Sequence, residues 1–284
     1  MRKNSGQALL IILLVMAVGL TIGLAVISRS VTDIGISRRE EDSARVFSVA
    51  EAGIEEALRL GYAPSGGVEI GGIRATVTQS KIGNSPQFVF PDEYEAGDVQ
   101  TLWLVEHGEQ GNLDLNNRYR GGSVEVYWGK PGSTTIPALE VTLIYNKGGV
   151  KIMRWALDPD MRWALDPDIG RNNGFDKAIS PGTRLGGKDF GYKKSLSLPC
   201  SQTEVICYAL RLRLLYNDQP QILGVDGGDR EFPSQGVYFE SVASTNNLNE
   251  EEKITKKVGR WQLYSSPPGI FDYVLYSEGD LTKQ

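Results

Sequence analysis

The sequence predicts an α+β protein in which one long N-terminal helix packs on a β-rich globular domain. Two observations lead to this fold class. Residues 8–27 carry no charge, and the segment after them contains no proline as far as Leu60. From residue 61 on, apolar residues alternate with polar ones between glycine pairs, which is typical of strands and turns. We therefore expect a leader at 1–6, a helix at 7–60 and a β-rich domain at 61–284.

The apolar run at residues 8–27 is long enough to cross a membrane. Twenty helical residues rise about 30 Å, which matches the hydrocarbon core of a bilayer. Arg2 and Lys3 precede the run, and such basic flanks tend to remain in the cytoplasm. The far flank mixes basic residues such as Arg29 with acidic residues such as Asp33. We expect residues 28–284 to lie outside the cytoplasm.

Three interpretations of this run compete: a cleaved secretory signal peptide, an uncleaved anchor, and a leader that is cut just before the run. The apolar region of a signal peptide usually spans about 7–15 residues and ends at a cleavage site with small residues. This run is longer and continues into a charged helical segment. Those features favour a mature protein that keeps the run.

The helix is expected to continue past the membrane, as an amphipathic segment at 28–60. Apolar residues recur there at spacings of three and four, which places them on one stripe. These residues are Val46, Val49, Ala50, Gly53, Ile54, Ala57 and Leu58. Glu55 and Arg59 have the spacing of a surface ion pair. Gly61 and Pro64 provide a stop, so the helix would be about 80 Å long.

The N-terminal residues carry a resemblance to a known family. A basic leader, Gly6 directly before the apolar run, and a helix that continues into an Ala/Glu-rich segment at 49–58 resemble a type IV prepilin. The Gln7-Ala-Leu-Leu start is most similar to PilX-type minor pilins and to the K-type minor pseudopilin of type II secretion. The resemblance covers about residues 1–60. It implies that prepilin peptidase cuts after Gly6 and that the new N-terminus at Gln7 is methylated.

One residue departs from the pattern of main-shaft pilins. Those subunits usually carry a Glu at the fifth residue after the cleavage point, and that position is Ile11 here. The resemblance therefore implies a minor pilin or pseudopilin-like subunit. Such a subunit primes or joins a type IV pilus or a type II secretion-like filament at its tip. Its partners would be membrane lipid and other pilin or pseudopilin subunits, contacted through the N-terminal helix.

The resemblance also implies a location, and alternatives to it stay open. The protein would be a single-pass protein of the inner (cytoplasmic) membrane with its C-terminal domain outside, passing into a pilus at the cell surface. The main alternative is a non-filamentous, membrane-anchored extracytoplasmic binding module. A third is a secreted β-domain that ordinary signal peptidase releases.

Gly19 and Gly23 form a G-x-x-x-G pattern inside the apolar run. Small residues let membrane helices approach closely, so this face is a candidate for packing against another subunit. Glycine is also common in membrane helices without such a role.

Alternating patterns predict strands in the rest of the chain. Leu210, Leu212 and Leu214 alternate with Arg211 and Arg213, which predicts a half-buried strand. Further strands are expected at 73–77, 102–105, 123–128, 139–145, 236–240 and 271–276. The polar, glycine-rich segments 167–194 and 243–257 are expected to be long loops, and no second long helix is expected.

Cys200 and Cys207 are the only cysteines. In an exported domain such a pair favours a disulfide, which would stabilise by roughly 2–3 kcal/mol, and two free thiols are the alternative. Without His or further Cys nearby, the pair is not a zinc site.

An eight-residue segment occurs twice in tandem, at 153–160 and 161–168. It is too short for a solenoid repeat and indicates a local duplication. Asp166, Asp168 and Asn172 lie near it, but their spacing does not match a calcium loop. The sequence predicts no metal site and no cofactor.

Motifs for catalysis are missing, so the chain is not expected to be an enzyme. His107 is the only histidine and is expected at a strand end. The chain contains no nucleophile elbow, phosphate-binding loop or dinucleotide fingerprint. Its net charge is −5, and without Arg2 and Lys3 it is about −7. No nucleic acid partner is expected, because phosphate contacts need basic surface.

Overall fold

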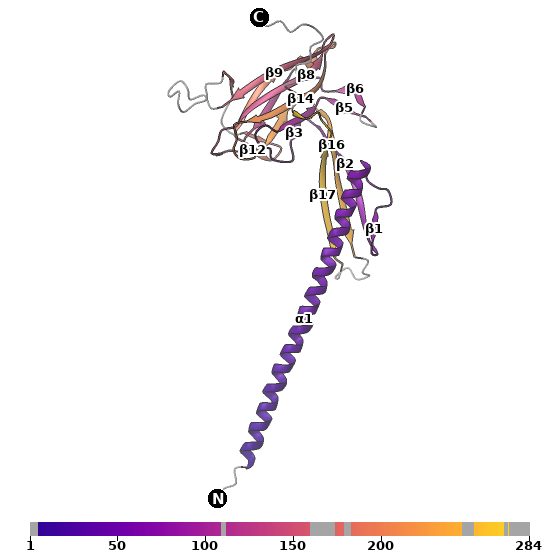
Figure 1. Ribbon diagram of the computed structural model, residues 1–284, viewed down its shortest axis with the longest axis vertical. Coiled ribbons are helices and arrows are strands. Elements are labelled where there is room, and N and C mark those ends of the chain that lie inside the picture. The colour runs from indigo at the N-terminus through magenta and orange to yellow at the C-terminus, as the bar shows by residue number, and fades with distance from the viewer. Residues whose placement is uncertain are drawn as a thin grey trace. The chain divides into compact units, whose positions relative to one another are not determined.

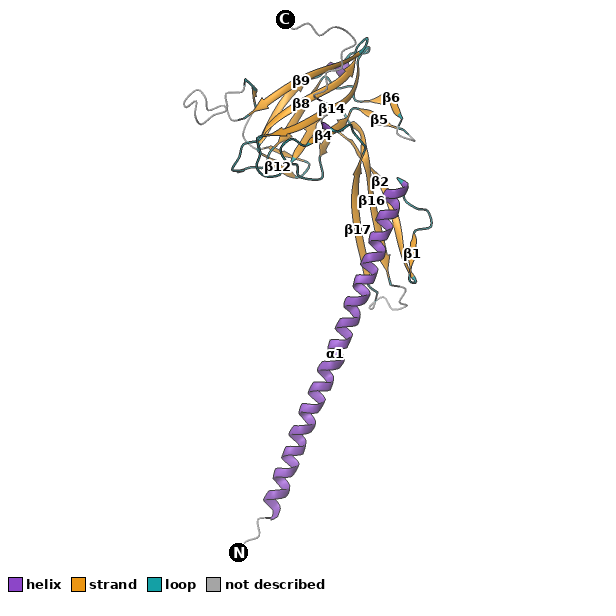
Figure 2. Ribbon diagram, viewed as in Figure 1, coloured by secondary structure: helices purple, strands orange, loops and turns teal. Residues whose placement is uncertain are grey.

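The computed structural model describes residues 5–108, 112–159, 174–178, 183–245, 253–269 and 272 (Figure 1). It confirms the α+β class, with α1 (Ser5–Leu60) as the long helix of the described residues and strands making up most of the described chain beyond it (Figure 2). The chain forms two compact units. The helical unit comprises Met1–Gln79 and Phe239–Arg260, and the β unit comprises Ser80–Tyr238 and Trp261–Gln284.

The helix begins at Ser5 and ends where the sequence predicts. Gly61 has a φ of 78°, a conformation that glycine adopts without a steric penalty, and its N–H donates to Ala57 O at 2.8 Å. This local bond satisfies a carbonyl of the last turn. A glycine directly after Leu60 therefore ends the helix.

The helical unit contains part of a four-stranded sheet with the order β1-β2-β16-β17. Its strands are β1 (Val68–Ile70), β2 (Ile73–Ser85), β16 (Phe232–Ser244) and β17 (Thr255–Leu263). The boundaries between the two units fall within the last three. Gly71 and Gly72 join β1 to β2 with φ values of 57° and 77°. Two positive φ values in a two-residue loop define the hairpin turn that matches strand twist.

The predicted apolar stripe of α1 packs on this sheet. Val46, Val49 and Ala50 are buried in one cluster with sheet residues, which are Ile73, Ala75 and Ala243, and with half-buried Ile254 and Val258. Ile54 and Ala57 are also buried, and Leu58 is half-buried. The stripe is thus confirmed as core.

Gly53 marks the closest approach of α1 to the sheet. A Cβ at this position would clash with Ser241 Oγ and would lie 3.1 Å from Val77 Cγ2 and 3.3 Å from Ala75 Cβ. Only a glycine lets the helix sit at this separation without displacing its neighbours.

The predicted ion pair at the end of α1 has a different partner. Arg59 bonds to Glu56, with Nε–Oε2 at 2.8 Å and Nη2–Oε1 at 2.6 Å, rather than to Glu55. A spacing of three also brings helical side chains together, and here it gives the guanidinium both carboxylate oxygens.

The β unit is built on two larger sheets. The first has the order β10-β9-β8-β14-β4 and the second the order β13-β7-β15-β3. The first contains β4 (Val99–Trp103), β8 (Ala138–Asn146), β9 (Val150–Asp158), β10 (Asp176–Lys177) and β14 (Ile206–Leu215). The second contains β3 (Gln87–Val89), β7 (Ser123–Trp128), β13 (Tyr192–Ser197) and β15 (Leu223–Asp226).

Two small hairpins and a short helix also belong to this unit. The hairpins are β5 (Val105–His107) with β6 (Leu113–Arg118), and β11 (Thr183–Leu185) with β12 (Lys188–Phe190). A 3-10 helix, η3, spans Pro199–Ser201.

One hydrophobic core joins the two larger sheets. Val126 and Trp128 of β7 belong to the same buried cluster as Leu143 of β8 and Leu212 of β14. Trp128 satisfies its indole by donating from Nε1 to Pro137 O at 2.9 Å. The arrangement is that of two sheets packed face to face, with alternate residues directed inward.

Most predicted strands are confirmed, and one predicted loop is wrong. The strands expected at 73–77, 123–128, 139–145, 210–214 and 236–240 lie within β2, β7, β8, β14 and β16, and 102–105 falls in β4 and β5. The sequence predicts a loop over 167–194, but this segment contains β10, β11, β12 and the start of β13. The ends of segment 243–257 belong to β16 and β17. Of the strand expected at 271–276, only Asp272 is described.

The prediction that β14 is half-buried is wrong. Arg211 and Arg213 are only 3% and 6% exposed, so both faces of the strand are covered. Each guanidinium bonds to a backbone carbonyl of the C-terminal part of the chain, at Pro267 and Gly269. That segment covers the face that the alternating pattern predicts to face solvent.

The cysteines form a disulfide between η3 and β14. Cys200 and Cys207 are both buried, with Cα atoms 5.6 Å apart. The bridge holds the start of β14 next to the turn that precedes it.

Residues 153–158 of the first copy of the tandem repeat belong to β9. Met153, Trp155 and Leu157 of β9 lie opposite Leu143, Val141 and Leu139 of β8. The second copy, together with Asp166, Asp168 and Asn172, lies outside the described residues.

We expect Gly53→Ala to destabilise the helical unit by about 1–3 kcal/mol, although Gly→Ala within a helix usually stabilises by about 1 kcal/mol. The new Cβ would meet Ser241 Oγ, so adding Ser241→Ala should recover much of the loss. Amide hydrogen exchange in residues 46–57 measures the effect. Gly35→Ala is the matched control, because nothing lies within 4 Å of a Cβ there. Equal protection in the Gly53 and Gly35 variants would contradict the close contact.

Replacing both cysteines by serine should lower the free energy of unfolding of the β unit by about 2–3 kcal/mol, because the bridge restricts the unfolded chain. Denaturant unfolding measures the change, with Thr203→Ser in the same loop as control. In unreduced, denatured protein, an alkylating reagent should label neither cysteine. Labelling of both would mean that the bridge does not form.

Candidate functional site

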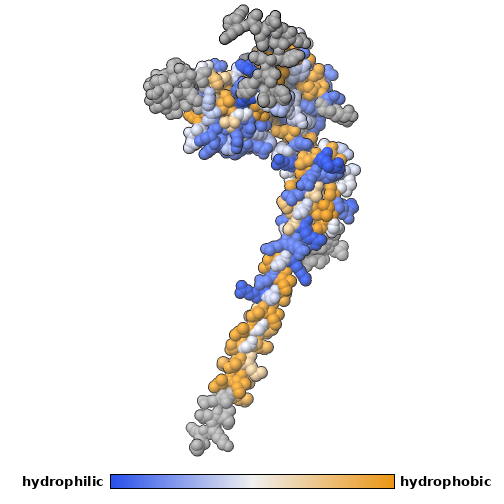
Figure 3. Space-filling model, viewed as in Figure 1, coloured by the Kyte–Doolittle hydropathy of each residue, from blue (hydrophilic) through white to orange (hydrophobic). Residues whose placement is uncertain are grey.

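The most unusual surface of the described chain is the first half of α1. Its large apolar side chains from Leu9 to Ile27 are between 49% and 71% exposed. None of the apolar window of this helix is buried inside the protein. Figure 3 shows apolar residues along this part of α1 and polar residues further on. The helix is therefore apolar on all sides and has no partner within the described chain.

Water is an unfavourable environment for an apolar surface of this size. Burial of each large apolar side chain is worth about 1.5–3 kcal/mol, so the fourteen here amount to about 20–40 kcal/mol. The whole folding stability of a domain is about 5–15 kcal/mol. Among the described residues, α1 is the helix long and apolar enough to cross a membrane. Length and composition alone would also suit a signal sequence.

The residues at the predicted cleavage point lie at the start of α1. Gly6 and Gln7 are in its first turn, where the structure describes the backbone. Ile11, which stands where main-shaft pilins carry Glu, is 60% exposed. No carboxylate lies in the described helix before Asp33.

Gly19 and Gly23 lie one turn apart on the same face of α1. Nothing in the described chain comes within 4 Å of a Cβ built at either position. Their lack of side chains therefore serves no contact inside this chain. It leaves a shallow place on the apolar surface where a second helix could approach closely.

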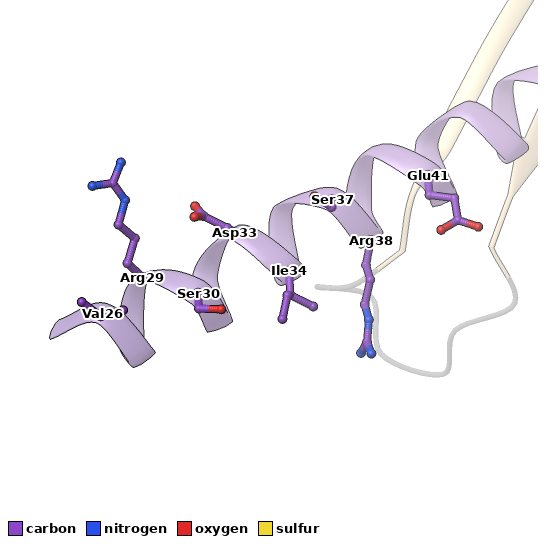
Figure 4. Close-up of a pocket in the computed structure, with 8 residues that line it drawn as sticks. All are labelled: Val26, Arg29, Ser30, Asp33, Ile34, Ser37, Arg38 and Glu41. Atoms are coloured by element: carbon purple, nitrogen blue, oxygen red, sulfur yellow. The ribbon is translucent and has the colours of Figure 1, made fainter. Parts of the chain in front are cut away.

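Charged residues begin directly after the apolar part. Arg29, Asp33, Arg38 and Glu41 line one shallow hollow on α1 together with Val26, Ser30, Ile34 and Ser37 (Figure 4). All eight come from the one helix, so no second element closes the hollow around a ligand. Opposite charges lie three or four residues apart, a spacing at which helical side chains attract each other. The hollow suits a helix flank at a membrane boundary better than a small-molecule site.

His107 is the last residue of β5, as predicted. Its ring stacks on Tyr264 with centroids 4.2 Å apart and meets Trp103 edge-on at 4.5 Å. The neighbouring Glu106 is buried, and it accepts from Lys81 Nζ at 2.7 Å and from the Ser234 N–H at 2.8 Å. The Ser234 hydroxyl lies 3.1 Å from the Tyr264 hydroxyl and makes no bond to His107. The group is therefore arranged for packing.

No metal site is found among the residues that the structure describes, since no group of three or more His, Cys, Asp or Glu side chains lies close enough to hold an ion. The two cysteines are bonded to each other, so neither can serve as a thiolate ligand or nucleophile.

The stability of the β unit should fall with acid near pH 6. Burial lowers the pKa of His107 below 6.5, and the charge of Glu106 opposes this shift only in part. The unfolded chain therefore binds the proton more readily. The contribution is complete above about pH 6.5 and is lost as the pH falls towards the lowered pKa. Denaturant unfolding at pH 7.5 and 5.5 should show a smaller loss for His107→Gln than for wild type. Equal losses would contradict this role of His107.

In comparisons with known proteins, no family model matches the chain, and neither a curated protein nor a solved structure matches it. The candidate site is therefore defined by the residues of this chain alone. They form an exposed apolar helix that continues into a folded body.

Proposed function

We propose that this protein is a minor pilin or pseudopilin-like subunit, anchored in the cytoplasmic membrane and exported from residue 28 on. The observation that carries the proposal is the two-part nature of α1. Its first half is apolar on all sides and unpartnered in the described chain, and its last turns are part of a folded core. A cleavable signal sequence needs no such continuity, because it is removed from the domain that it exports.

The proposed action is mechanical and positional rather than catalytic. In the membrane, lipid covers the surface from Leu9 to Ile27. In a filament, the apolar helices of other subunits replace that lipid, so the same surface serves both states without an exposed intermediate. Gly19 and Gly23 would let a neighbouring helix come close. Prepilin peptidase would act first, cutting after Gly6 and leaving Gln7 as the methylated N-terminus.

The disulfide supports export of the β unit. Structural disulfides persist in oxidising compartments and are rare in the cytosol. Cys200 and Cys207 pair within a buried part of the β unit, where the bridge is protected from solvent. This agrees with an extracytoplasmic location for residues 28–284.

Ile11 supports a place at the filament tip and also favours the second candidate function. A subunit at the tip has no neighbour ahead of it, so it needs no carboxylate in the membrane to pair with another subunit's amine. A plain membrane-anchored binding module, with no filament, needs none either. The two candidates differ in whether the leader is removed.

The mass of the mature N-terminus, measured on protein purified from membranes, should correspond to N-methylated Gln7. The Gly6→Leu variant should keep Met1 and should not co-purify with filaments, because the residue before the cut is changed. Gly19→Leu places the same substitution inside the apolar run and should be processed normally.

Retention of Met1 in the wild-type protein would support the non-filamentous anchor. A mature start beyond Ile27 would show a secreted domain. Normal processing and assembly of Gly6→Leu would contradict the filament proposal.

A further inference from the structure

The outer side of β17 is a part of the described surface that the proposed function does not use. β17 (Thr255–Leu263) is the last strand in the order β1-β2-β16-β17, so no described strand pairs with its other side (Figure 1). Such a side presents unpaired N–H and C=O groups, which can pair with another chain. The part from Thr255 to Arg260, which we call the β17 edge, belongs to the helical unit together with α1.

The register between β16 and β17 shows which backbone groups point outward. Thr245 N–H donates to Ile254 O at 3.0 Å, and towards the other end Tyr264 N–H donates to Gln235 O at 3.0 Å. The two bonds fit one antiparallel register without a shift. In such a pair, bonded residues alternate along each strand with residues whose backbone groups point away from it. The groups that point away from β16 are those of Thr255, Lys257 and Gly259.

Side-chain contacts agree with this register. Tyr238 and Trp261, which the register places opposite each other, have ring centroids 4.7 Å apart. Lys257 Nζ lies 2.6 Å from Glu240 Oε2 on the same face. Val258 is half-buried on the other face, against the hydrophobic cluster that contains α1 residues. β17 is therefore a regularly paired strand over its described length, without the bulge that proteins often use to blunt an edge.

The two outer strands of the sheet differ in how well they are protected against pairing. β1 has only three residues, and a short edge strand is one means of avoiding unwanted partners. β17 has nine residues and no proline. Its outward-pointing residues Thr255, Lys257 and Gly259 are exposed. The β17 edge is thus long enough and open enough to accept a further strand.

The charges of the β17 edge indicate what kind of strand it accepts. Lys256 and Arg260 lie two residues to either side of Val258, so the three side chains share the face towards α1. Within the described chain, neither cation makes a hydrogen bond or an ion pair. An added antiparallel strand would place three of its own side chains opposite this row. A carboxylate, an apolar residue and a second carboxylate at those positions match the row in charge and polarity.

The same charges argue against a second copy of this chain as the partner. Antiparallel pairing of two β17 edges about Val258 would put Lys256 of each copy opposite Arg260 of the other. Like charges directly opposite each other destabilise a sheet. A strand with carboxylates at these positions removes the repulsion and adds an attraction. The occupant that the edge favours is therefore an acidic segment of another protein.

We propose that the β17 edge is a docking site for an extended acidic segment of a partner protein, which joins the sheet as a fifth strand. Backbone hydrogen bonds to the outward-pointing groups provide the affinity. The side chains of Lys256, Val258 and Arg260 select a carboxylate, an apolar residue and a carboxylate at alternate positions of the segment. The site does not depend on whether the protein belongs to a filament.

Residue-resolved amide exchange of the full-length protein in detergent tests whether the edge is open. Without a ligand, the N–H of Val258 should exchange slowly, because it faces β16, and those of Thr255, Lys257 and Gly259 should exchange quickly. Slow exchange of this outward set would mean that the chain itself covers the edge. Slow exchange that depends on protein concentration would mean that a second copy does. Either result would overturn the proposal.

The probe for binding is a fluorescent peptide, Thr-Glu-Thr-Val-Thr-Glu-Thr with blocked ends, which carries the two carboxylates and the apolar residue in the proposed spacing. It should bind saturably below about 1 mM and slow the exchange of the outward-pointing amides. The same peptide with Gln in place of both Glu should bind about three- to tenfold more weakly, because two exposed ion pairs are lost.

Two matched pairs separate strand pairing from general attraction. N-methylation of the third and fifth peptide residues removes the N–H groups that face β17 and should abolish binding, whereas N-methylation of the fourth removes an N–H that faces away and should not. In the protein, Gly259→Pro removes one outward N–H without breaking a bond to β16. It should weaken binding at least about tenfold, and Gly259→Ala, which keeps the N–H, should bind as wild type does.

Failure of the acidic peptide to bind the wild-type protein would overturn the proposal. So would undiminished binding of the Gln peptide, of the peptide methylated at its third and fifth residues, or by folded Gly259→Pro. The peptide comparisons use the unaltered protein, so they still test the proposal if Gly259→Pro does not fold.

Discussion

The close contact between α1 and its sheet is the constraint on which the helical unit depends. Gly53 lets the stripe that begins at Val46 lie directly against β2 and β16, where Val49 and Ala50 become core residues. Without that contact, the last turns of α1 would be a surface helix with little to hold it, because isolated helices are marginal in water. With that contact, the last turns of one uninterrupted helix belong to the core, while its first half remains an exposed apolar surface.

In the β unit, buried polar side chains that bond to backbone groups have a comparable role in holding the fold together. The side chain of Gln235 bonds to both backbone groups of Trp103, at 2.7 and 2.8 Å, and so takes the place of a neighbouring strand at the end of β4. Gln221, which is fully buried, accepts from the Lys130 N–H in a similar way. Glu106 bridges Lys81 and the backbone of Ser234. Each buried polar side chain satisfies a group that would otherwise be costly to bury.

Local patterns in the sequence were sufficient for the helix, its stripe and most strands, because these depend on neighbouring residues. The hairpin of β11 and β12 was missed although Gly186 and Gly187, with φ values of 53° and 84°, form its two-residue turn. That Gly-Gly step indicates a hairpin turn, whereas the polar composition around it favours a loop. The burial of Arg211 and Arg213 had no local signal, since their cover comes from residues more than 50 positions later in the chain. For the candidate site, the composition of residues 8–27 is enough to predict the apolar run. The proposed cleavage between Gly6 and Gln7 would depend on an enzyme outside the chain, so no contact within the chain can indicate it.

Because α1 is continuous, its length also sets the distance between its apolar part and the folded body. Eighteen residues, 28–45, separate the end of the apolar part from Val46, the first fully buried residue of the helix. At about 1.5 Å per residue they measure about 27 Å. With the apolar part in lipid and the helix upright, the folded body starts that far above the bilayer. Under the proposed function, the helix would then act as a spacer of fixed length and would set how far from the membrane the helical unit lies while the protein is anchored.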